Sequence, residues 1–353
     1  MNIYRETVPY ILTWYDYNAR ILPWRSDPTP YHVWLSEIML QQTRVEAVKD
    51  YYERFLSELP TIYDLAGVSE ERLLKLWEGL GYYSRARNLK KAAELVVSRY
   101  NGELPADFGE LRALPGIGNY TAGAILSIAF RKPEPAVDGN LLRVFSRITG
   151  STEDILKASV REELRKNLRS VMPEDRPGDF NQGLMDLGAT VCIPNGKPHC
   201  DICPVMHLCR AFHEGRTEEL PVKGEKAGRT VCRYTVFVIT DGERYLLMKR
   251  PEKGLLGGLW GFPMASGGAV RENAGERIPA EIPVVPGKVT ALKPAKHIFS
   301  HVEWHMSGFR IEAKETGSLP ENFVWASAEE IRDRYSVPAA YRAFMPKEGR
   351  NEG

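Results

Sequence analysis

Four of the five cysteines lie close together near the middle of the chain, which is the spacing of residues that hold a metal or a cluster. They are Cys192, Cys200, Cys203 and Cys209, with seven, two and five residues between them. A four-cysteine zinc site usually pairs two short CxxC hairpins, whereas this stretch has one CxxC and two outer cysteines that stand alone. The spacing therefore favours an iron–sulfur cluster, with structural zinc as the alternative.

Two carboxylates have surroundings that suit acid–base chemistry. Glu37 lies in the apolar run VWLSEIML, where burial would raise its pKa and keep a proton available. Asp138, in AVDGN, directly precedes the helical pattern NLLRVFSR. A surface charge is the alternative for Glu37. A helix N-cap is the alternative for Asp138, although this residue could both cap and catalyse.

A Pro-Gly-x-Gly turn separates two helical patterns in FGELRALPGIGNYTAGAILSIAF. Gly116 and Gly118 permit left-handed backbone, and the following helix, expected to begin near Asn119, would present unpaired amides to an anion such as phosphate. Taken alone, the motif fits a tight turn between helices equally well. A cluster of basic residues follows GLGYY and indicates either a nucleic-acid contact or a solvated helix face; it comprises Arg85, Arg87, Lys90 and Lys91.

The composition is that of an ordinary globular protein with two domains. The chain has 353 residues, 43% hydrophobic and 26% charged, with a formal net charge of +1, so bulk charge does not indicate a nucleic-acid partner. Polar and charged residues interrupt every short apolar run of MNIYRETVPYILTWYDYNARILPW. We therefore expect neither a signal peptide nor a membrane span, and the cytoplasm is the expected location.

The pattern of apolar residues changes along the chain. Apolar residues recur at helical spacing from residue 4 to about 213, which predicts an all-α domain over 1–213. From Thr230 the pattern alternates, and a strand, an Asp241-Gly242 turn and a second strand predict an α+β domain over 230–353. The polar segment 214–229 is the predicted linker between them.

Several motifs in this order resemble one known family. SEIMLQQT, GLGYYSRARNL, LPGIGNYTAGA, VDGNLLRVFSR, FNQGLMDLGA and the cysteine cluster resemble the adenine DNA glycosylases of the MutY type, in the helix-hairpin-helix superfamily. The resemblance implies a helix-hairpin-helix at about 108–130 and a 4Fe–4S module at about 186–212. The family usually has six residues between its first two cysteines, and a loop absorbs the seventh at little cost in closure entropy.

The resemblance also implies catalytic roles that make chemical sense. Adenine leaves poorly unless it is protonated, and the sugar gains positive charge as the bond breaks. By resemblance, Glu37 protonates adenine N7 and then helps to activate water, while Asp138 stabilises the sugar cation. Tyr120 and Asn140 complete the implied catalytic group.

Further residues are assigned to DNA by the same resemblance. A base inside the duplex must be extruded into a pocket, and the hole it leaves must be filled. The pocket residues would be Trp24, Arg25, Leu40 and Gln182. Contacts with the opposite base would come from Gln42, Thr43, Leu80 and Tyr82. Arg85 of the basic cluster and Gly116 and Gly118 of the hairpin are the further predicted DNA contacts. For Trp24 and Tyr82, ordinary packing in the core is the alternative.

Two positions separate this chain from endonuclease III, a relative with the same hairpin and cluster. That enzyme cuts the strand through a lysine Schiff base, and Tyr120 stands at the position of its lysine; a phenol cannot form an imine. Leu142 occupies a position where some adenine glycosylases carry a lysine that traps the product. We therefore expect base removal without efficient strand cleavage.

The carboxy-terminal half resembles the Nudix fold, with GLLGGLWGFP similar to the segment before a Nudix box. The glutamate-rich RExxEE helix that would hold magnesium is absent from GGAVRENAGERIPAEI, so nucleotide hydrolysis is not expected. Phe299, Ser300 and His301 match the family loop that recognises 8-oxoguanine, and an ordinary loop at a strand end is the alternative.

The expected activity is removal of adenine paired with 8-oxoguanine or guanine in double-stranded DNA, by a monomer that does not bind membranes. Two readings from other classes remain. A noncatalytic damage-binding protein is opposed by the presence of Glu37 and Asp138. A nucleotide-pool hydrolase is opposed by the missing acidic helix.

Overall fold

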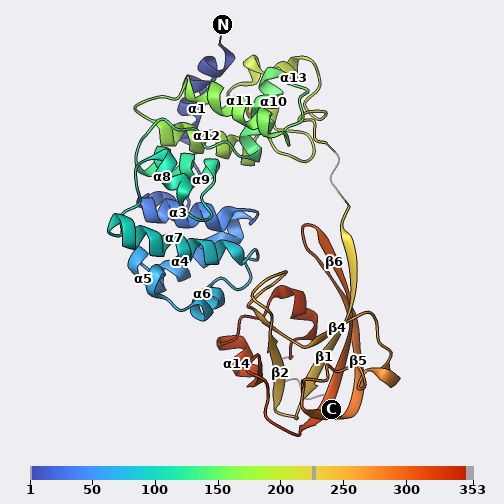
Figure 1. The fold of residues 1–353 in the computed structure, drawn as a ribbon. Helices are drawn as coiled ribbons and strands as arrows, with labels where there is room; N and C mark the ends of the chain where they lie inside the picture. Colours follow the sequence, from blue (N-terminus) through green and yellow to red (C-terminus); the bar gives the residue numbers. More distant parts are fainter. Residues whose placement is uncertain (1, 225–227, 347–353) are drawn as a thin grey trace. The chain divides into compact units, whose positions relative to one another are not determined.

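The computed structural model describes residues 2–224 and 228–346, and its chain forms two compact units (Figure 1). The first unit comprises Met1–Gly67 and Arg87–Glu225, and the second comprises Val68–Ala86 and Lys226–Gly353. The second unit is therefore discontinuous in sequence. A short segment from the helical half belongs to it by its contacts.

The described residues up to 213 are helical and contain no strand. The helices are α1 (Ile3–Asn18), α2 (Pro23–Ser26), α3 (Pro30–Leu40), α4 (Val45–Glu58), α5 (Ile62–Gly67), α6 (Glu70–Leu76), α7 (Ser84–Tyr100), α8 (Phe108–Ala113), α9 (Asn119–Ala124), the π-helical turn η1 (Ile125–Ala129), α10 (Gly139–Thr149), α11 (Ala158–Arg169), α12 (Pro177–Thr190), the 3-10 turns η2 (Cys200–Ile202) and η3 (Met206–Leu208), and α13 (Arg210–His213). This agrees with the all-α expectation for this half of the chain. No helix in residues 2–224 or 228–346 is long and apolar enough to cross a membrane.

Helices α1, α10 and α12 share one apolar core. Leu141 and Phe145 on α10 pack with Phe180 and Leu184 on α12, and all four are at most 2% exposed. Each fully buried side chain of this size contributes about 1.5–3 kcal/mol. This core fixes α10 against α12, and the two helices carry Asp138 at the N-cap of α10 and Gln182 along α12.

The predicted hairpin is formed by α8, a turn over residues 114–118 and α9. Gly116 has the left-handed φ of +80°, as the motif predicts, and an added Cβ would lie 2.9 Å from the Asn88 Cβ. Gly118 differs from the expectation, because its φ is −89° and its backbone is extended at the N-cap of α9. Only Gly116 therefore has a left-handed backbone conformation that favours glycine.

A tight packing site connects the hairpin to the segment before Asp138. A Cβ at Gly123 would lie 2.4 Å from the Pro135 carbonyl oxygen. The buried Asn181 amide donates to Ser127 Oγ at 2.8 Å and to the Glu134 carbonyl at 2.9 Å, and its Oδ1 accepts from the Ala136 amide at 3.1 Å. These contacts fix residues 134–136 against η1 and α12.

The carboxy-terminal half is built on a seven-stranded sheet in the order β3-β2-β1-β6-β5, with β4 paired to β1 and β7 paired to β2. The elements are β1 (Thr230–Thr240), β2 (Arg244–Lys249), β3 (Trp260–Gly261), β4 (Met264–Ser266), η4 (Arg271–Asn273), β5 (Val284–Ile298), β6 (Val302–Glu315), β7 (Phe323–Ser327), α14 (Ala328–Asp333) and η5 (Ala339–Phe344). The expected strand–turn–strand around Asp241-Gly242 is β1–β2. Strands β1 and β6 pair in parallel, which the sequence did not indicate.

The two faces of the sheet bury different cores. Alternate residues of β1 separate them: Val236 and Val238 lie on the face covered by α14 and η5, and Phe237 and Ile239 lie on the other. Between β4 and β5, the only helix in the described residues is the three-residue η4. The acidic Nudix helix is therefore absent from the fold as well as from the sequence.

Candidate active site and cysteine cavity

Most of the predicted catalytic and pocket residues line one hollow in the helical unit. It has about 830 Å³ of empty space, and α2, α3, α9, α12 and the start of α10 surround it. The predicted residues on its wall are Trp24, Arg25, Glu37, Leu40, Thr43, Tyr120, Asp138, Asn140 and Gln182. Residues from opposite ends of the helical domain are thus brought to a single cavity.

Glu37 and Tyr120 are paired across this hollow. Glu37 is only 5% exposed on α3, and the Tyr120 hydroxyl in the first turn of α9 donates to Glu37 Oε2 at 2.5 Å. Burial raises the pKa of Glu37 to about 7, against the stabilising effect of the Tyr120 hydrogen bond. Burial also raises the pKa of Tyr120 well above 10, so the phenol stays a donor. Glu37 can therefore hold or release a proton near neutral pH.

Asp138 caps α10 with one carboxylate oxygen, and its other oxygen accepts a hydrogen bond from Asn140, which also lines the hollow. Its Oδ1 accepts from the Leu141 amide at 2.8 Å, and its Oδ2 accepts from Asn140 Nδ2 at 2.8 Å. Burial raises the pKa of Asp138, while hydrogen bonds from Leu141 and Asn140 and the charge of Arg143 oppose that rise. The helix N-terminus also favours a negative charge at this position. The N-cap alternative is thus correct, and it is compatible with a second role.

A second row of buried groups holds Asn140 in place. Arg143 Nη2 donates to Asn140 Oδ1 at 2.9 Å and to the Gly188 carbonyl at 2.7 Å. Arg143 Nε donates to the Cys192 carbonyl at 2.8 Å. The Asp138–Asn140 pair is therefore connected through one guanidinium to the backbone of the first cysteine.

Asp186 was not predicted as a site residue, yet its side chain holds Arg25 in position at the hollow. Its buried carboxylate accepts from both terminal nitrogens of Arg25, at 2.7 and 2.9 Å, and from Arg20 Nε at 2.7 Å. Arg20 and Met185 also line the hollow. No local pattern connects residues about 160 positions apart, so Arg20, Asp186 and Met185 were missed.

Trp24 is both a core and a cavity residue. Its ring is buried on α2 and packs edge-on against Tyr52 at 5.6 Å between centroids, and it also lines the hollow. The packing alternative is therefore correct for one side of the ring. It leaves the other side at the cavity.

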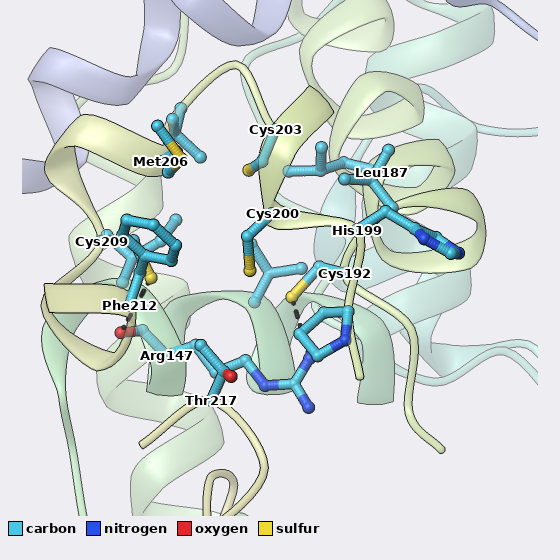
Figure 2. A pocket seen from close by; sticks show the side chains of 15 residues that line it. Arg147, Leu187, Cys192, His199, Cys200, Cys203, Met206, Cys209, Phe212 and Thr217 are labelled. Atoms are coloured by element: carbon cyan, nitrogen blue, oxygen red, sulfur yellow. Dashed lines mark hydrogen bonds between the residues drawn. The ribbon is translucent and has the colours of Figure 1, made fainter. Parts of the chain in front are cut away.

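The four clustered cysteines line a different cavity, shown in Figure 2, with about 390 Å³ of empty space. Their sulfurs surround the same space, and Arg147 Nη1 donates to Cys192 Sγ at 3.2 Å while its Nε donates to the Leu220 carbonyl at 2.9 Å. Within residues 2–224 and 228–346, no three His, Cys, Asp or Glu side chains stand close enough together to hold a metal ion. The donor set itself, four thiols on one cavity beside a guanidinium, fits a four-thiolate group in kind.

The predicted wedge residues lie in two turns. Gln42 has a φ of +57° and is exposed in the turn between α3 and α4, beside Thr43. Tyr82 has a φ of +45° and is 44% exposed in the turn between α6 and α7, where Leu80 is buried. The two turns belong to different compact units.

Arg85 supports the second of these turns from inside. It is 9% exposed, its Nη2 donates to the Leu80 carbonyl at 3.0 Å and to the Gly81 carbonyl at 3.1 Å, and burial lowers its pKa to about 10. A contact of Arg85 with DNA stays a prediction. The two hydrogen bonds of its Nη2 described here are to the protein backbone.

Phe299, Ser300 and His301 form the turn between β5 and β6. The Phe299 amide donates to the Val302 carbonyl at 2.8 Å, and the Phe299 ring packs against Trp304 at 5.0 Å. Ser300 and His301 are exposed, with Ser300 Oγ 3.1 Å from His301 Nδ1. The turn thus presents two polar side chains on an aromatic anchor.

Comparison with known proteins gives family matches in both halves. Residues 35–170 match the family described as "HhH-GPD superfamily base excision DNA repair protein", and residues 235–347 match the NUDIX domain. The adenine DNA glycosylase of Mus musculus is 34% identical over 402 residues, covering 97% of this chain and 78% of the mouse protein. That of Buchnera aphidicola (subsp. Acyrthosiphon pisum) is 38% identical over 254 residues, covering 72% of each chain.

Solved structures resemble the helical half. A thermostable thymine-DNA glycosylase superposes with a TM-score of 0.55 at 30% identity, over 60% of this chain and 97% of its own. Endonuclease III, in a trapped covalent intermediate with DNA, gives 0.51 at 26% identity, over 60% and 96%. With the helical fold, the Nudix-like sheet and relatives aligned over nearly its whole length, the chain belongs to the adenine DNA glycosylases, a family of base-excision repair enzymes.

Proposed function

We propose that this enzyme removes adenine paired with 8-oxoguanine, or with guanine, by hydrolysing the N-glycosidic bond and leaving an abasic site. The observation that carries the proposal is the buried Glu37, whose pKa is raised to about 7 in the same hollow that Asp138 lines. A protonatable acid and a second carboxylate are what cleavage of a purine nucleoside requires.

Glu37 is the proton donor in this proposal. Its proton goes to adenine N7, so the electron pair of the breaking N9–C1′ bond leaves with a neutral base. The Glu37 carboxylate that remains accepts a proton from the water that adds to C1′, which restores the acid. The Tyr120 hydrogen bond holds the carboxyl group in place through both steps.

Asp138 is the charge that faces the sugar. It receives two hydrogen bonds and sits at a helix N-terminus, which favours its ionised form more than the single hydrogen bond to Glu37 does. An ionised carboxylate stabilises the positive charge that develops at C1′. Asn140 orients this carboxylate and is itself oriented by Arg143.

The remaining wall of the hollow would receive the extruded adenine. Leu40 and the side of Trp24 that lines the hollow offer apolar surface, and Gln182 and Arg25 offer polar groups for the base edge. Arg25 is held by Asp186, so its position is fixed before the base arrives. A preformed pocket reduces the ordering cost of binding.

Contacts with the rest of the duplex come from the turns. We assign the phosphate backbone to the hairpin at Gly116 and Gly118. Helix α9 has no side-chain cap at Gly118, and the amides of a helix N-terminus suit an anion such as phosphate. Gln42, Thr43, Leu80 and Tyr82 would fill the gap beside the opposite base. Arg85 would contribute to DNA binding beside this turn, whose Leu80 carbonyl accepts from its Nη2. Ser300 and His301 would read the 8-oxoguanine edge, with Phe299 as their anchor.

Tyr120 makes base removal the end of the reaction. Strand cleavage by a Schiff base needs an amine at the sugar, and the side chain here is a phenol that stays neutral. We therefore propose a monofunctional enzyme.

A 4Fe–4S cluster is the cofactor we propose for the four cysteines. When bound, it supplies a rigid covalent centre for residues 192–209. Arg147 and Arg143, which bond to the sulfur and the carbonyl of Cys192, would transmit that rigidity to α10. We further propose that the enzyme acts as a monomer on nucleoid DNA in a bacterial cytoplasm.

One assay tests the proposed function. Duplexes that carry 8-oxoguanine:A, G:A or thymine glycol are incubated with excess enzyme, and base release is followed with and without alkali. We expect adenine release from the first two duplexes and none from the third. The Glu37→Gln variant should keep mismatch binding and release no adenine. Full activity of that variant would remove Glu37 from the mechanism, and binding without release by the wild type would favour a damage-binding protein.

A further inference from the structure

Residues 68–86 belong by their contacts to the same compact unit as the carboxy-terminal sheet. This segment consists of α6 and the turn that follows it, in which Gly79, Gly81 and Tyr82 all have positive φ angles. The turn carries Leu80 and Tyr82, two residues assigned above to the opposite base. The contacts that hold α6 in the same unit as the sheet therefore affect how the opposite base would be recognised.

Two charged side chains, one in the last turn of α6 and one just after the helix, bind the backbone in and after α14. Lys75 Nζ pairs with Glu78 Oε2 at 2.5 Å and donates to the Tyr335 carbonyl at 3.0 Å and to the Ile331 carbonyl at 3.5 Å. Glu78 Oε1 accepts from the Val337 amide at 2.8 Å. We name Lys75, Glu78 and these three backbone groups the α6 clamp (Figure 1 shows α6 and α14).

The α6 clamp is partly shielded from water. The side chains of Lys75 and Glu78 are 12% and 27% exposed. Ile331 lies in the last turn of α14, where carbonyls lack helical partners and a cation is favoured. Charge-assisted hydrogen bonds of this kind are stronger than those between neutral groups.

The turn beyond the clamp is held by the flanking side chains of Trp77 and Arg85. Trp77 Nε1 donates to the Gly81 carbonyl at 3.1 Å, and Arg85 Nη2 bonds the carbonyls of Leu80 and Gly81. The Arg85 guanidinium lies over the Trp77 ring at 5.4 Å. The position of Leu80 and Tyr82 is thus set by α6.

On the side of the sheet, the α6 clamp is connected by packed residues to the turn at 299–301. The Ser336 carbonyl accepts from the Trp260 amide at 3.1 Å, and Val337 lies in the core that also contains Trp304. Phe299 packs on Trp304 at 5.0 Å. Packed groups therefore connect Glu78 to the turn at 299–301 within one unit.

We propose that Lys75 and Glu78 are positioning residues for recognition of the opposite base, which hold the turn at 79–82 in register with the turn at 299–301. The inference rests on the proposed function. Neither residue touches the reacting atoms, and their removal changes which mispair is preferred rather than the chemistry itself. Recognition of 8-oxoguanine would use both turns, whereas guanine lacks the altered edge that Ser300 would recognise.

The test compares single-turnover adenine release from 8-oxoguanine:A and G:A duplexes by the full-length protein. For Glu78→Ala we expect the ratio of the two rates to fall about five- to tenfold, with the G:A rate within about twofold of wild type. Glu78→Gln keeps an acceptor for the Val337 amide and should lose less. Hydrogen exchange at the Val337 amide should accelerate in Glu78→Ala and change little in Glu78→Gln. Lys75→Met provides an independent variant if Glu78→Ala does not fold.

Matched controls and a double variant decide the outcome. Glu153→Gln and Lys157→Met alter an exposed pair elsewhere and should leave the ratio unchanged. Combined with Ser300→Ala, Glu78→Ala should lower the ratio by less than the product of the two single effects. An unchanged ratio in Glu78→Ala and Lys75→Met, or fully multiplicative effects, overturns the proposal while the proposed function stands. A wild-type enzyme that releases adenine at equal rates from both duplexes would overturn this inference alone, and one that releases adenine from neither duplex would overturn the proposed function as well.

Discussion

The Tyr120 hydroxyl lies 2.5 Å from Glu37 Oε2, where it donates a hydrogen bond to a carboxylate that burial would otherwise keep protonated. A phenol whose own pKa is raised well above 10 cannot replace Glu37 as the acid near neutral pH. Tyr120 therefore lowers the pKa of Glu37, and removing its hydroxyl should raise that pKa.

Tyr120→Phe should move the alkaline limb of the pH–rate profile to higher pH. The hydrogen bond stabilises the ionised carboxylate, so its loss raises the pKa of Glu37 above its present value of about 7. The measurement is the single-turnover rate of adenine release between pH 5 and 9, at about half-unit steps. Tyr17→Phe, at a position 86% exposed on α1, serves as the control. A limb that stays in place or moves to lower pH would contradict the role given to Tyr120.

Glu37→Gln should stabilise the fold above neutral pH while abolishing activity. The folded-state pKa of about 7 lies above the ordinary value of 4.5. The unfolded chain therefore ionises first as pH rises, and stability falls between those two values and then stays level. Glutamine has no such loss, so the variant should gain about 3 kcal/mol over wild type at pH 8 and about zero near pH 4. Urea unfolding at both pH values measures this. Glu153→Gln, an exposed carboxylate, should show no pH-dependent gain.

Asp138→Asn and Asp138→Ala should separate the two roles of this residue. Asparagine can still cap α10 by accepting from the Leu141 amide, so the first variant should lose base release but less than about 0.5 kcal/mol of stability. Alanine also removes the cap, which costs about 1 kcal/mol more. Thermal unfolding and the release assay are compared on both variants. Equal stability of the two would refute the capping contribution, and an active Asp138→Asn would refute the electrostatic one.

Asn181→Ala should destabilise the fold and slow base release together. Its amide satisfies Ser127 Oγ, the Glu134 carbonyl and the Ala136 amide, and the last two lie just before Asp138. Unsatisfied buried groups cost about 1–3 kcal/mol each, so a loss of about 3 kcal/mol or more is expected. Asn322→Ala, at an exposed position in the carboxy-terminal half, is the comparison. Wild-type stability of Asn181→Ala would show that water replaces the amide.

Metal analysis tests the proposed 4Fe–4S cluster. Protein purified without oxygen should contain about four iron atoms and four sulfides per chain, and Cys203→Ser should lose most of them. One zinc ion per chain with no sulfide would establish the alternative that the cysteine spacing left open.

Local patterns predicted those features that depend on neighbours in the chain. The helical period of NLLRVFSR gave α10 and its cap at Asp138, and the apolar neighbours of Glu37 gave its burial and raised pKa. The hairpin followed from Pro-Gly-x-Gly, although Gly118 needs no special backbone conformation. Each of these depends on interactions within a few residues, which is the range that periodicity reports.

Features that depend on distant partners were beyond such patterns. Asp186 bonds Arg25 across 161 positions, and the parallel pairing of β1 with β6 joins strands about 70 residues apart. The burial of Arg85 was also not predictable from the basic cluster that contains it, and its contact with DNA stays a prediction. Charge is visible in a sequence, whereas the direction in which a side chain points is decided by tertiary packing.

The discontinuity of the second unit limits how freely the two halves can be exchanged between relatives. Because α6 precedes the linker in sequence but contacts α14 through Lys75 and Glu78, a carboxy-terminal domain transplanted from another species would meet a foreign α6. Chimaeras that swap residues 230–353 alone should therefore be impaired, and those that carry residues 68–86 with them should recover. Selection would then act on residues 68–86 and 230–353 together, as on one module encoded in two separate places.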